Sequence, residues 1–233
     1  MALPVILSVP HAGLRVPEEA APYCRLGPRD IIKDGDEGAD AIFALASRVA
    51  AHVTTDIARA IVDVNRSPDD RTADGVVKTH TCHGVPVYQP QPPEAVVRTL
   101  LSRYYHPYHE RLRGFDESAA RVGIDCHTMC AIGPPIGPDP GAERPAACLS
   151  NGEGTCPEAW LSALAECLSR ALGEPVAINH PFRGGYIIRE HAARLPWLQL
   201  EISRAPFLSL EEKREAIGDA LEAWCRVIAA SAG

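Results

Sequence analysis

Apolar and polar residues follow two different periods along this chain. Short, nearly continuous apolar runs predict strands at residues 4–9, 58–64, 122–126, 176–179 and 198–202. Longer segments with apolar residues at helical spacing predict helices at residues 36–53, 93–122, 157–172 and 210–230. Residues 67–86 are polar and rich in turn-forming residues, and residues 132–145 are dense in proline and glycine, so both segments predict loops.

Strands that alternate with helices predict one α/β fold. Parallel strands need long crossover connections, and the helices of those connections cover both faces of the sheet. The chain has 233 residues, enough for one continuous core, and shows no internal repeat or low-complexity linker. We therefore expect a single domain over residues 1–233 with a mixed, mostly parallel sheet.

The composition of the chain narrows the classes of binding partner that we expect. Apolar residues make up 46% and charged residues 23% of the chain, as in ordinary globular proteins, and the net charge is −7. This acidic balance argues against nucleic acid or an anionic membrane as the main partner. No apolar run has the length of a membrane span, and the first residues enter a strand without a basic region or a cleavage site. We therefore expect a cytoplasmic protein.

The eight cysteines do not form a disulfide pattern. They are scattered and no secretory signal accompanies them, so we expect free thiols, several of them buried. Cys126 and Cys130 are the closest pair. Their spacing is CxxxC rather than the CxxC of a zinc ribbon, which makes them weak candidates for metal ligands.

Two histidines lie where predicted strands end. His11 follows the strand at 4–9, and His127 follows the strand at 122–126. In α/β proteins this edge of the sheet is where ligands bind. A catalytic zinc takes about three protein ligands and keeps an open position, and an acid of the 34–37 turn would complete the set. The alternative is that those acids only favour a helix N-terminus.

Three further positions carry candidate chemistry. Arg66, which follows Asn65, has the planar guanidinium that suits a carboxylate, unless it only pairs with a nearby aspartate. Glu201 is a lone carboxylate in an almost apolar strand, which indicates either a general base or a buried partner of Arg204. His109 is predicted to line the pocket from its helix, or else to pack within the helix layer.

Seven motifs occur in one order between residues 7 and 204 and together resemble a known family. They are Ser-Val-Pro-His-Ala-Gly, Asp-Gly-Asp-Glu-Gly-Ala, Val-Asp-Val-Asn-Arg, Tyr-His-Pro-Tyr-His, Asp-Cys-His-Thr-Met, Pro-Phe-Arg-Gly-Gly-Tyr-Ile and Leu-Gln-Leu-Glu-Ile. The series resembles the N-formylglutamate amidohydrolases, which share a fold and zinc chemistry with zinc carboxypeptidases and aspartoacylases. The resemblance implies a three-layer α/β/α domain.

The resemblance also implies a site. His11, Asp36 and His127 would bind Zn²⁺, with Glu37 as the alternative to Asp36. Glu201 would act as general base, and Arg66 with Asn65 would bind the substrate carboxylate. Arg183 would bind the second carboxylate of a glutamate moiety.

The expected reaction is zinc-assisted hydrolysis of a small N-acyl amino acid, N-formyl-L-glutamate first among the substrates. The turn at 34–37 lacks the aromatic residue common in the family, and residues 150–154 match the family's glycine-rich loop only loosely. These departures leave the exact acyl amino acid open. The alternatives are a zinc carboxypeptidase, a deacylase of another N-acyl amino acid, and a non-catalytic binding protein on the same fold. The sequence does not indicate an oligomeric state.

Overall fold

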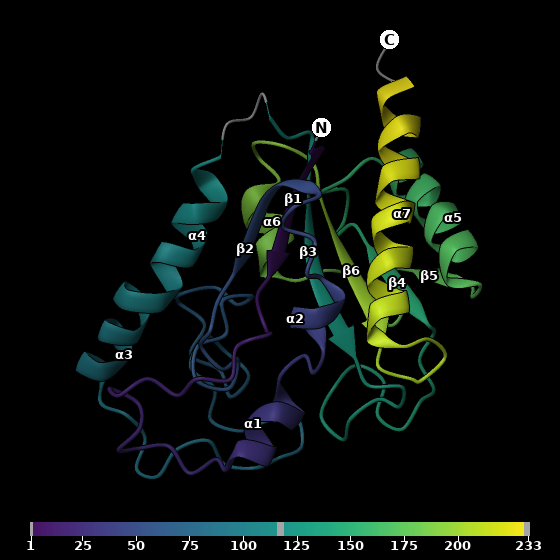
Figure 1. Ribbon diagram of the computed structural model, residues 1–233. Coiled ribbons are helices and arrows are strands. Elements are labelled where there is room, and N and C mark those ends of the chain that lie inside the picture. The colour runs from purple at the N-terminus through teal and green to yellow at the C-terminus, as the bar shows by residue number, and fades with distance from the viewer. Residues whose placement is uncertain (1, 116–118, 231–233) are drawn as a thin grey trace.

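Six strands form one sheet with the order β2-β1-β3-β6-β4-β5 (Figure 1). This computed structural model describes residues 2–115 and 119–230. The strands are β1 (Leu3–Val9), β2 (Val49–Thr54), β3 (Val122–Met129), β4 (Ala147–Ser150), β5 (Val176–Ile178) and β6 (Trp197–Ser203). β2, β1, β3 and β6 are parallel, β4 is antiparallel to β6, and β5 is parallel to β4. The predicted mixed, mostly parallel sheet is confirmed.

Helices cover both faces of this sheet. They are α1 (Pro28–Asp34), α2 (Ala39–Ile42), α3 (Glu94–Leu100), the π-helical η1 (Leu101–Tyr105), α4 (His106–Arg113), α5 (Glu158–Leu172), α6 (Tyr186–His191) and α7 (Leu210–Ala230). α2, α5 and α7 pack on one face, and α3, η1, α4 and α6 pack on the other (Figure 1). The three-layer arrangement is therefore confirmed. In the described part of the chain no helix is long and apolar enough to cross a membrane.

The central strands direct alternate residues to these two faces, because successive side chains of a strand point in opposite directions. On β3, Ile124 and Cys126 enter the apolar core under α5 and α7, whereas Asp125 and His127 point to the opposite face. β6 behaves in the same way: Leu198, Leu200 and Ile202 face α7, and Gln199 and Glu201 do not. One face is thus apolar throughout, and the other becomes polar towards the carboxyl ends of the strands.

Two of the predicted elements are wrong. Residues 36–53 form only the four-residue helix α2 and then the edge strand β2, whose residues alternate between buried and exposed. Residues 58–64 are buried but irregular, with turn hydrogen bonds such as the one from Ile61 N to Ala58 O. β2 takes the place beside β1 that the apolar run at 58–64 would have needed.

The predicted strand at 4–9 and the helices at 157–172 and 210–230 are confirmed within a few residues. The helix predicted at 93–122 is divided into α3, η1 and α4 and ends at Arg113. Positions 116–118 of that prediction lie outside the described residues. α1, β4 and α6 were not predicted, and each is seven residues long or less.

Candidate active site

Polar side chains from three neighbouring strands meet at the carboxyl end of the sheet. The parallel register places Ser8 of β1 beside Asp125 of β3, and Asp125 beside Gln199 of β6. One step further along, His127 lies beside Glu201. All five residues are buried. The sheet therefore brings together groups that are far apart in the sequence.

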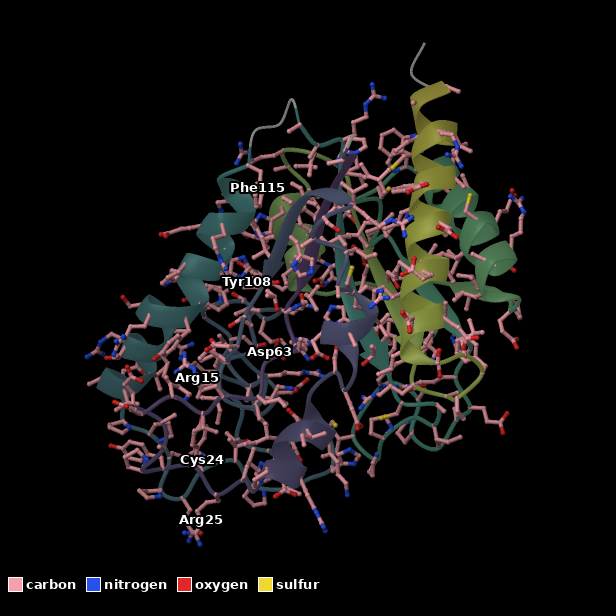
Figure 2. All side chains as sticks on the ribbon, in the orientation of Figure 1. Arg15, Cys24, Arg25, Asp63, Tyr108 and Phe115 are labelled. Atoms are coloured by element: carbon pink, nitrogen blue, oxygen red, sulfur yellow. The ribbon has the colours of Figure 1, made fainter. Side chains whose placement is uncertain are left out.

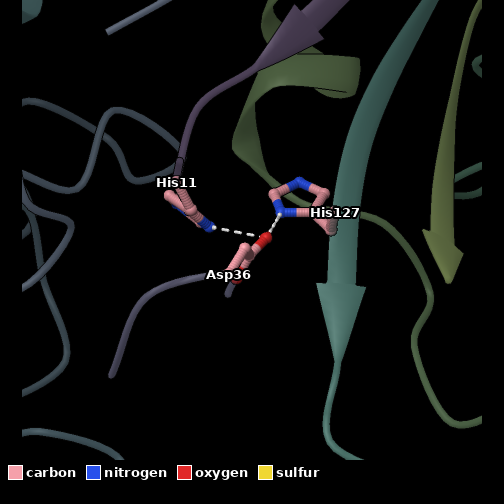
Figure 3. Close-up of side chains that lie close together, drawn as sticks. All are labelled: His11, Asp36 and His127. Atoms are coloured by element: carbon pink, nitrogen blue, oxygen red, sulfur yellow. Dashed lines mark hydrogen bonds and ion pairs between the residues drawn. The ribbon is translucent and has the colours of Figure 1, made fainter. Parts of the chain in front are cut away.

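His11, Asp36 and His127 form a buried cluster at this edge (Figure 3). His11 follows β1, Asp36 lies between α1 and α2, and His127 is on β3. Oδ2 of Asp36 lies 2.9 Å from Nδ1 of His127 and 3.7 Å from Nδ1 of His11. The three candidate ligand atoms all lie within 4.8 Å of one another. The structure thus brings together the three residues that the sequence indicated as metal ligands.

The far nitrogen of each histidine ring is bonded to a second aspartate. Nε2 of His11 lies 2.8 Å from Oδ1 of Asp63, and Nε2 of His127 lies 2.8 Å from Oδ2 of Asp125. A carboxylate can only accept, so Nε2 of each ring donates. Nδ1 of His11 has no acceptor and keeps its lone pair, whereas Nδ1 of His127 donates to Oδ2 of Asp36 and would give up that proton to a bound ion. Histidines that bind metals are oriented by a carboxylate in this way.

Nδ1 of His11 supplies the test of whether these residues fit a metal. This atom is buried and has no hydrogen-bond partner in the described residues. An unpaired buried nitrogen that points at a carboxylate and a second imidazole nitrogen is explained if all three bind one ion. Two nitrogens and one carboxylate oxygen are a donor set typical of catalytic zinc. The residues present therefore fit a zinc ion.

Asp36, rather than Glu37, turns towards the histidines. Glu37 is exposed, and its backbone carbonyl accepts a hydrogen bond from the Thr128 hydroxyl. The backbone N–H of Thr128 donates to Oδ2 of Asp36. Burial alone would raise the pKa of Asp36, but the adjacent His11 and His127 hold it well below its ordinary value. Asp36 is therefore ionised, as a metal ligand must be.

Glu201 has the opposite electrostatic environment. Burial raises its pKa to about 7, and the nearby His127 only partly opposes this rise. Oε1 accepts a hydrogen bond from Nε2 of Gln199 at 2.8 Å, and the described residues contain no ion pair between Glu201 and Arg204. Two carboxyl groups in one site whose pKa values are driven apart are a pattern typical of acid–base catalysis.

These groups lie on the wall of a cavity of about 340 Å³. The cavity is also lined by residues of both predicted loops, among them Asp74 and Cys82 from 67–86 and Ile136 and Arg144 from 132–145. Cys82 N donates to the buried carboxylate of Asp34, which ties the first loop to α1. The volume suits a small molecule.

Asn65 and Arg66 reach this cavity from the irregular segment after residue 64. Nδ2 of Asn65 donates to Oδ2 of Asp125, and Oδ1 accepts from the backbone N–H of Ile187. A Cβ on Gly185 would lie 2.3 Å from the Asn65 amide, so only glycine allows α6 to begin here. The Arg66 guanidinium is partly exposed and pairs with Asp74 at 2.6 Å.

The structure places one of the last two predicted site residues at the cavity and the other away from it. Arg183 is an exposed residue on the cavity wall. His109 is buried and is not among the residues that line the cavity. Both of its ring nitrogens are bonded, to Nε2 of His191 and to the Val64 carbonyl, and burial lowers its pKa to about 4. His109 therefore packs between α4 and α6, which is the alternative that the sequence left open.

Sequence reasoning missed Asp63, a residue that organises the site. Asp63 is fully buried. Figure 2 labels it near the middle of the view and the exposed Arg25 near the lower edge. Besides binding His11, it accepts from the backbone N–H of Asn65 and pairs with Arg59 and with Lys78. The signal was present, since each of these charges stands in or beside an apolar run.

Burial alone would raise the pKa of Asp63, but His11, Arg66 and Lys78 hold it well below its ordinary value. Asp63 is therefore a carboxylate and can keep the ring of His11 oriented.

Cys126, one of the two cysteines considered as weak candidates for metal ligands, faces the apolar core on the opposite side of the sheet. All eight cysteines are free.

A three-layer α/β/α domain with two histidines and two differently charged carboxyl groups in one cavity is typical of hydrolases that use a metal ion. Residues 3–208 match the N-formylglutamate amidohydrolase family, and the chain belongs to this family. The resemblance seen in the sequence is thereby confirmed, and the protein is an enzyme of the amidohydrolase type.

Individual relatives are distant but cover most of the chain. The N-formylglutamate deformylase of Pseudomonas putida is 24% identical over 227 residues, which are 90% of this chain and 84% of that protein. The crystal structure of N-formylglutamate amidohydrolase from Ralstonia eutropha JMP134 is 22% identical with a TM-score of 0.76, covering 98% of this chain and 94% of that one. A gene product from Agrobacterium tumefaciens has the same TM-score at 18% identity, with 99% and 92% covered. At these identities the structures establish the fold.

Proposed function

We propose that this chain is a cytoplasmic, zinc-dependent enzyme that hydrolyses N-formyl-L-glutamate to formate and L-glutamate. Membership of the family supports the reaction class, and the relative from Pseudomonas putida is named for this activity. The observation that carries the zinc assignment is the buried, unpaired Nδ1 of His11, directed at Asp36 and His127.

A zinc ion held by these three residues would supply Lewis-acid chemistry, by polarising the formyl carbonyl and making water a stronger acid. Glu201 receives the proton of the attacking water and passes it to the nitrogen of the leaving amine. Its pKa of about 7 supports both steps, since a group with this pKa can accept and donate near neutral pH. Gln199 orients the carboxyl group of Glu201 by donating a hydrogen bond from its Nε2 to Oε1 of Glu201.

Arg66 binds the α-carboxylate of the substrate and so places the formyl amide beside Glu201. Its guanidinium lies on the cavity wall and keeps a contact with Asp74, an exposed acid that holds the fork in place. The Arg66 backbone carbonyl accepts a hydrogen bond from the Tyr105 hydroxyl at 2.8 Å, which fixes this segment to η1. Asn65 contributes by joining Asp125 to α6. Arg183, at the exposed side, attracts the anionic substrate.

A substrate panel tests the proposal directly. Purified, zinc-loaded protein is assayed for release of the acid from formyl, acetyl and succinyl derivatives of glutamate, and from a C-terminal dipeptide. We expect formate from N-formyl-L-glutamate at the highest kcat/KM, loss of activity with a chelator, and recovery on adding zinc. A preference for the acetyl or succinyl derivative would make the chain another deacylase, and a preference for the dipeptide would make it a carboxypeptidase. Tight binding without turnover of any compound would identify a binding protein.

A further inference from the structure

Arg204 follows β6 directly and lies on the cavity wall, three residues beyond Glu201. Its Nε atom is buried and has no hydrogen-bond partner in the described part of the chain. Its guanidinium also forms no ion pair with any acid that the structure describes. A charged donor that is enclosed in this way without a partner calls for an explanation, because protein donors removed from water are nearly always bonded.

The other arginines that line the cavity are either paired with an acid or exposed to solvent. Arg59, Arg66 and Arg144 each pair with an aspartate of the chain itself. Arg183 has no such partner in the described residues, but it is exposed and hydrated by solvent. Arg204 is therefore the partly enclosed arginine of the cavity whose charge the chain leaves unpaired within the described ranges.

The backbone around Arg204 is held from two sides. Nζ of Lys213, a buried residue of α7, donates to the carbonyls of both Ser203 and Ala205 at 2.8 Å. The backbone N–H of Arg204 donates to the carbonyl of Met129 at the end of β3. These contacts fix the Cα of Arg204, so its side chain projects from a defined point. A fixed origin is what a residue needs if it binds a ligand with a set geometry.

We propose that Arg204 binds the side-chain carboxylate of a dicarboxylic N-acyl amino acid, and so sets the preference of the enzyme for acidic substrates. The planar fork of a guanidinium matches a carboxylate with two hydrogen bonds. Arg66 holds the α-carboxylate from the loop side of the cavity, and Arg204 holds the second carboxylate from the end of β6. This inference rests on the proposed function for the orientation of the substrate.

The test compares two substrates that differ only in this carboxylate, N-formyl-L-glutamate and N-formyl-L-glutamine. Arg204→Gln should lower kcat/KM for the glutamate derivative by about 10- to 100-fold, the size of one lost charge-assisted contact, and leave the glutamine derivative nearly unchanged. Zinc content and Tm should stay as in the wild type. Arg170→Gln, an exposed arginine on α5, is the matched control and should change neither substrate.

Equal losses on both substrates, or no loss on either, would overturn the inference. A loss of selectivity in Arg183→Gln with normal selectivity in Arg204→Gln would assign the second carboxylate to Arg183 instead. If Arg204→Gln does not fold, Arg204→Lys keeps the charge without the fork. That variant should show a smaller but still selective loss.

A binding measurement separates this inference from the proposed reaction. Calorimetric titration of the zinc-loaded protein with L-glutamate and L-glutamine needs no turnover. We expect the wild type to prefer glutamate, and Arg204→Gln to lose that preference. If the wild type released no formate but showed this pattern, the proposed reaction would fail and the role of Arg204 would stand. A wild type that binds the two ligands equally would overturn the role of Arg204.

Discussion

The two faces of the central sheet use the same three strands in opposite ways. Leu200 of β6 points into the core beneath α7, where burial of an aliphatic side chain stabilises the fold by about 1.5–3 kcal/mol. Glu201, the next residue, points to the opposite face and is buried among other polar groups. Burying such groups is costly unless they are hydrogen-bonded. The apolar face therefore stabilises a domain whose other face is organised for chemistry.

The polar face is itself divided. Near the amino ends of the strands this face is apolar, because the Trp197 ring covers it there. The ring packs directly over Gly123, where an added Cβ would lie 2.2 Å from ring atoms. Towards the carboxyl ends nearly every polar atom is paired, as Asp125 is with Ser8, Asn65 and His127. Of the five buried side-chain atoms without a partner in the described residues, four belong to residues that line the cavity, namely His11, Asp34, Gln199 and Arg204, and the fifth is Nε1 of Trp197. This contrast teaches that a concentration of unpaired groups, rather than polar groups in general, marks the functional part of the face.

The largest effect on activity is expected from a substitution in the cluster of His11, Asp36 and His127. His127→Ala should leave a folded protein whose zinc content falls from about one ion per chain to near zero, because two remaining ligands bind zinc poorly. Formate release should fall to background. The control is His106→Ala, an exposed histidine of α4, which should keep zinc and activity. Full zinc content in His127→Ala, measured by elemental analysis, would remove this residue from the site.

A smaller effect on turnover is expected at Glu201. Glu201→Gln should keep zinc and Tm but lower kcat by about 10²–10⁴-fold, the usual contribution of a placed proton-transfer group. With a pKa of about 7, the wild-type carboxyl group is protonated and inactive at lower pH, so kcat/KM should fall as pH decreases below about 7. That acidic limb should be absent in the variant. Glu166→Gln, an exposed acid on α5, should behave as wild type. Near-normal turnover in zinc-loaded Glu201→Gln would exclude it as the base.

The smallest effect on turnover is expected on the apolar face. Leu200→Ala should lower the free energy of unfolding by about 2–5 kcal/mol, because it leaves a cavity in the core under α7. Zinc content and kcat per folded molecule should stay close to wild type. Denaturant unfolding and single-turnover assays measure the two quantities separately. A large fall in kcat without loss of stability would show that the two faces are not independent.

Much of the site was predictable because strand ends carry a local signal. His11 and His127 each follow an apolar run directly, and the acidic turn stands out by its density of charge. Parallel pairing then guarantees that such ends meet at one edge. Family motifs indicated which acid of the turn to prefer, and the structure turns Asp36 inwards.

The remainder depended on tertiary contacts that periodicity does not report. Residues 39–53 are rich in alanine and are compatible with a helix, but pairing with β1 makes Val49–Thr54 an edge strand. The apolar run at 58–64 has the composition of a strand, yet its backbone makes turns that deliver Asp63 to His11. Arg204 looked like a partner for Glu201, but its place beyond the end of β6 gives it a different environment.

The long sequence separation within the metal cluster has a consequence for folding. His11 and His127 are 116 positions apart by their numbers, and two further segments supply Asp36 and Asp63, the aspartate that orients His11. No short fragment of the chain contains the whole set, so the complete set of ligands exists only after the parallel sheet has formed, a slow, non-local step. An ion that binds only the folded state adds RT ln(1 + [ion]/Kd) to its stability, about 2.7 kcal/mol at a hundredfold excess over Kd. Metal supply and the lifetime of the folded enzyme are therefore thermodynamically linked.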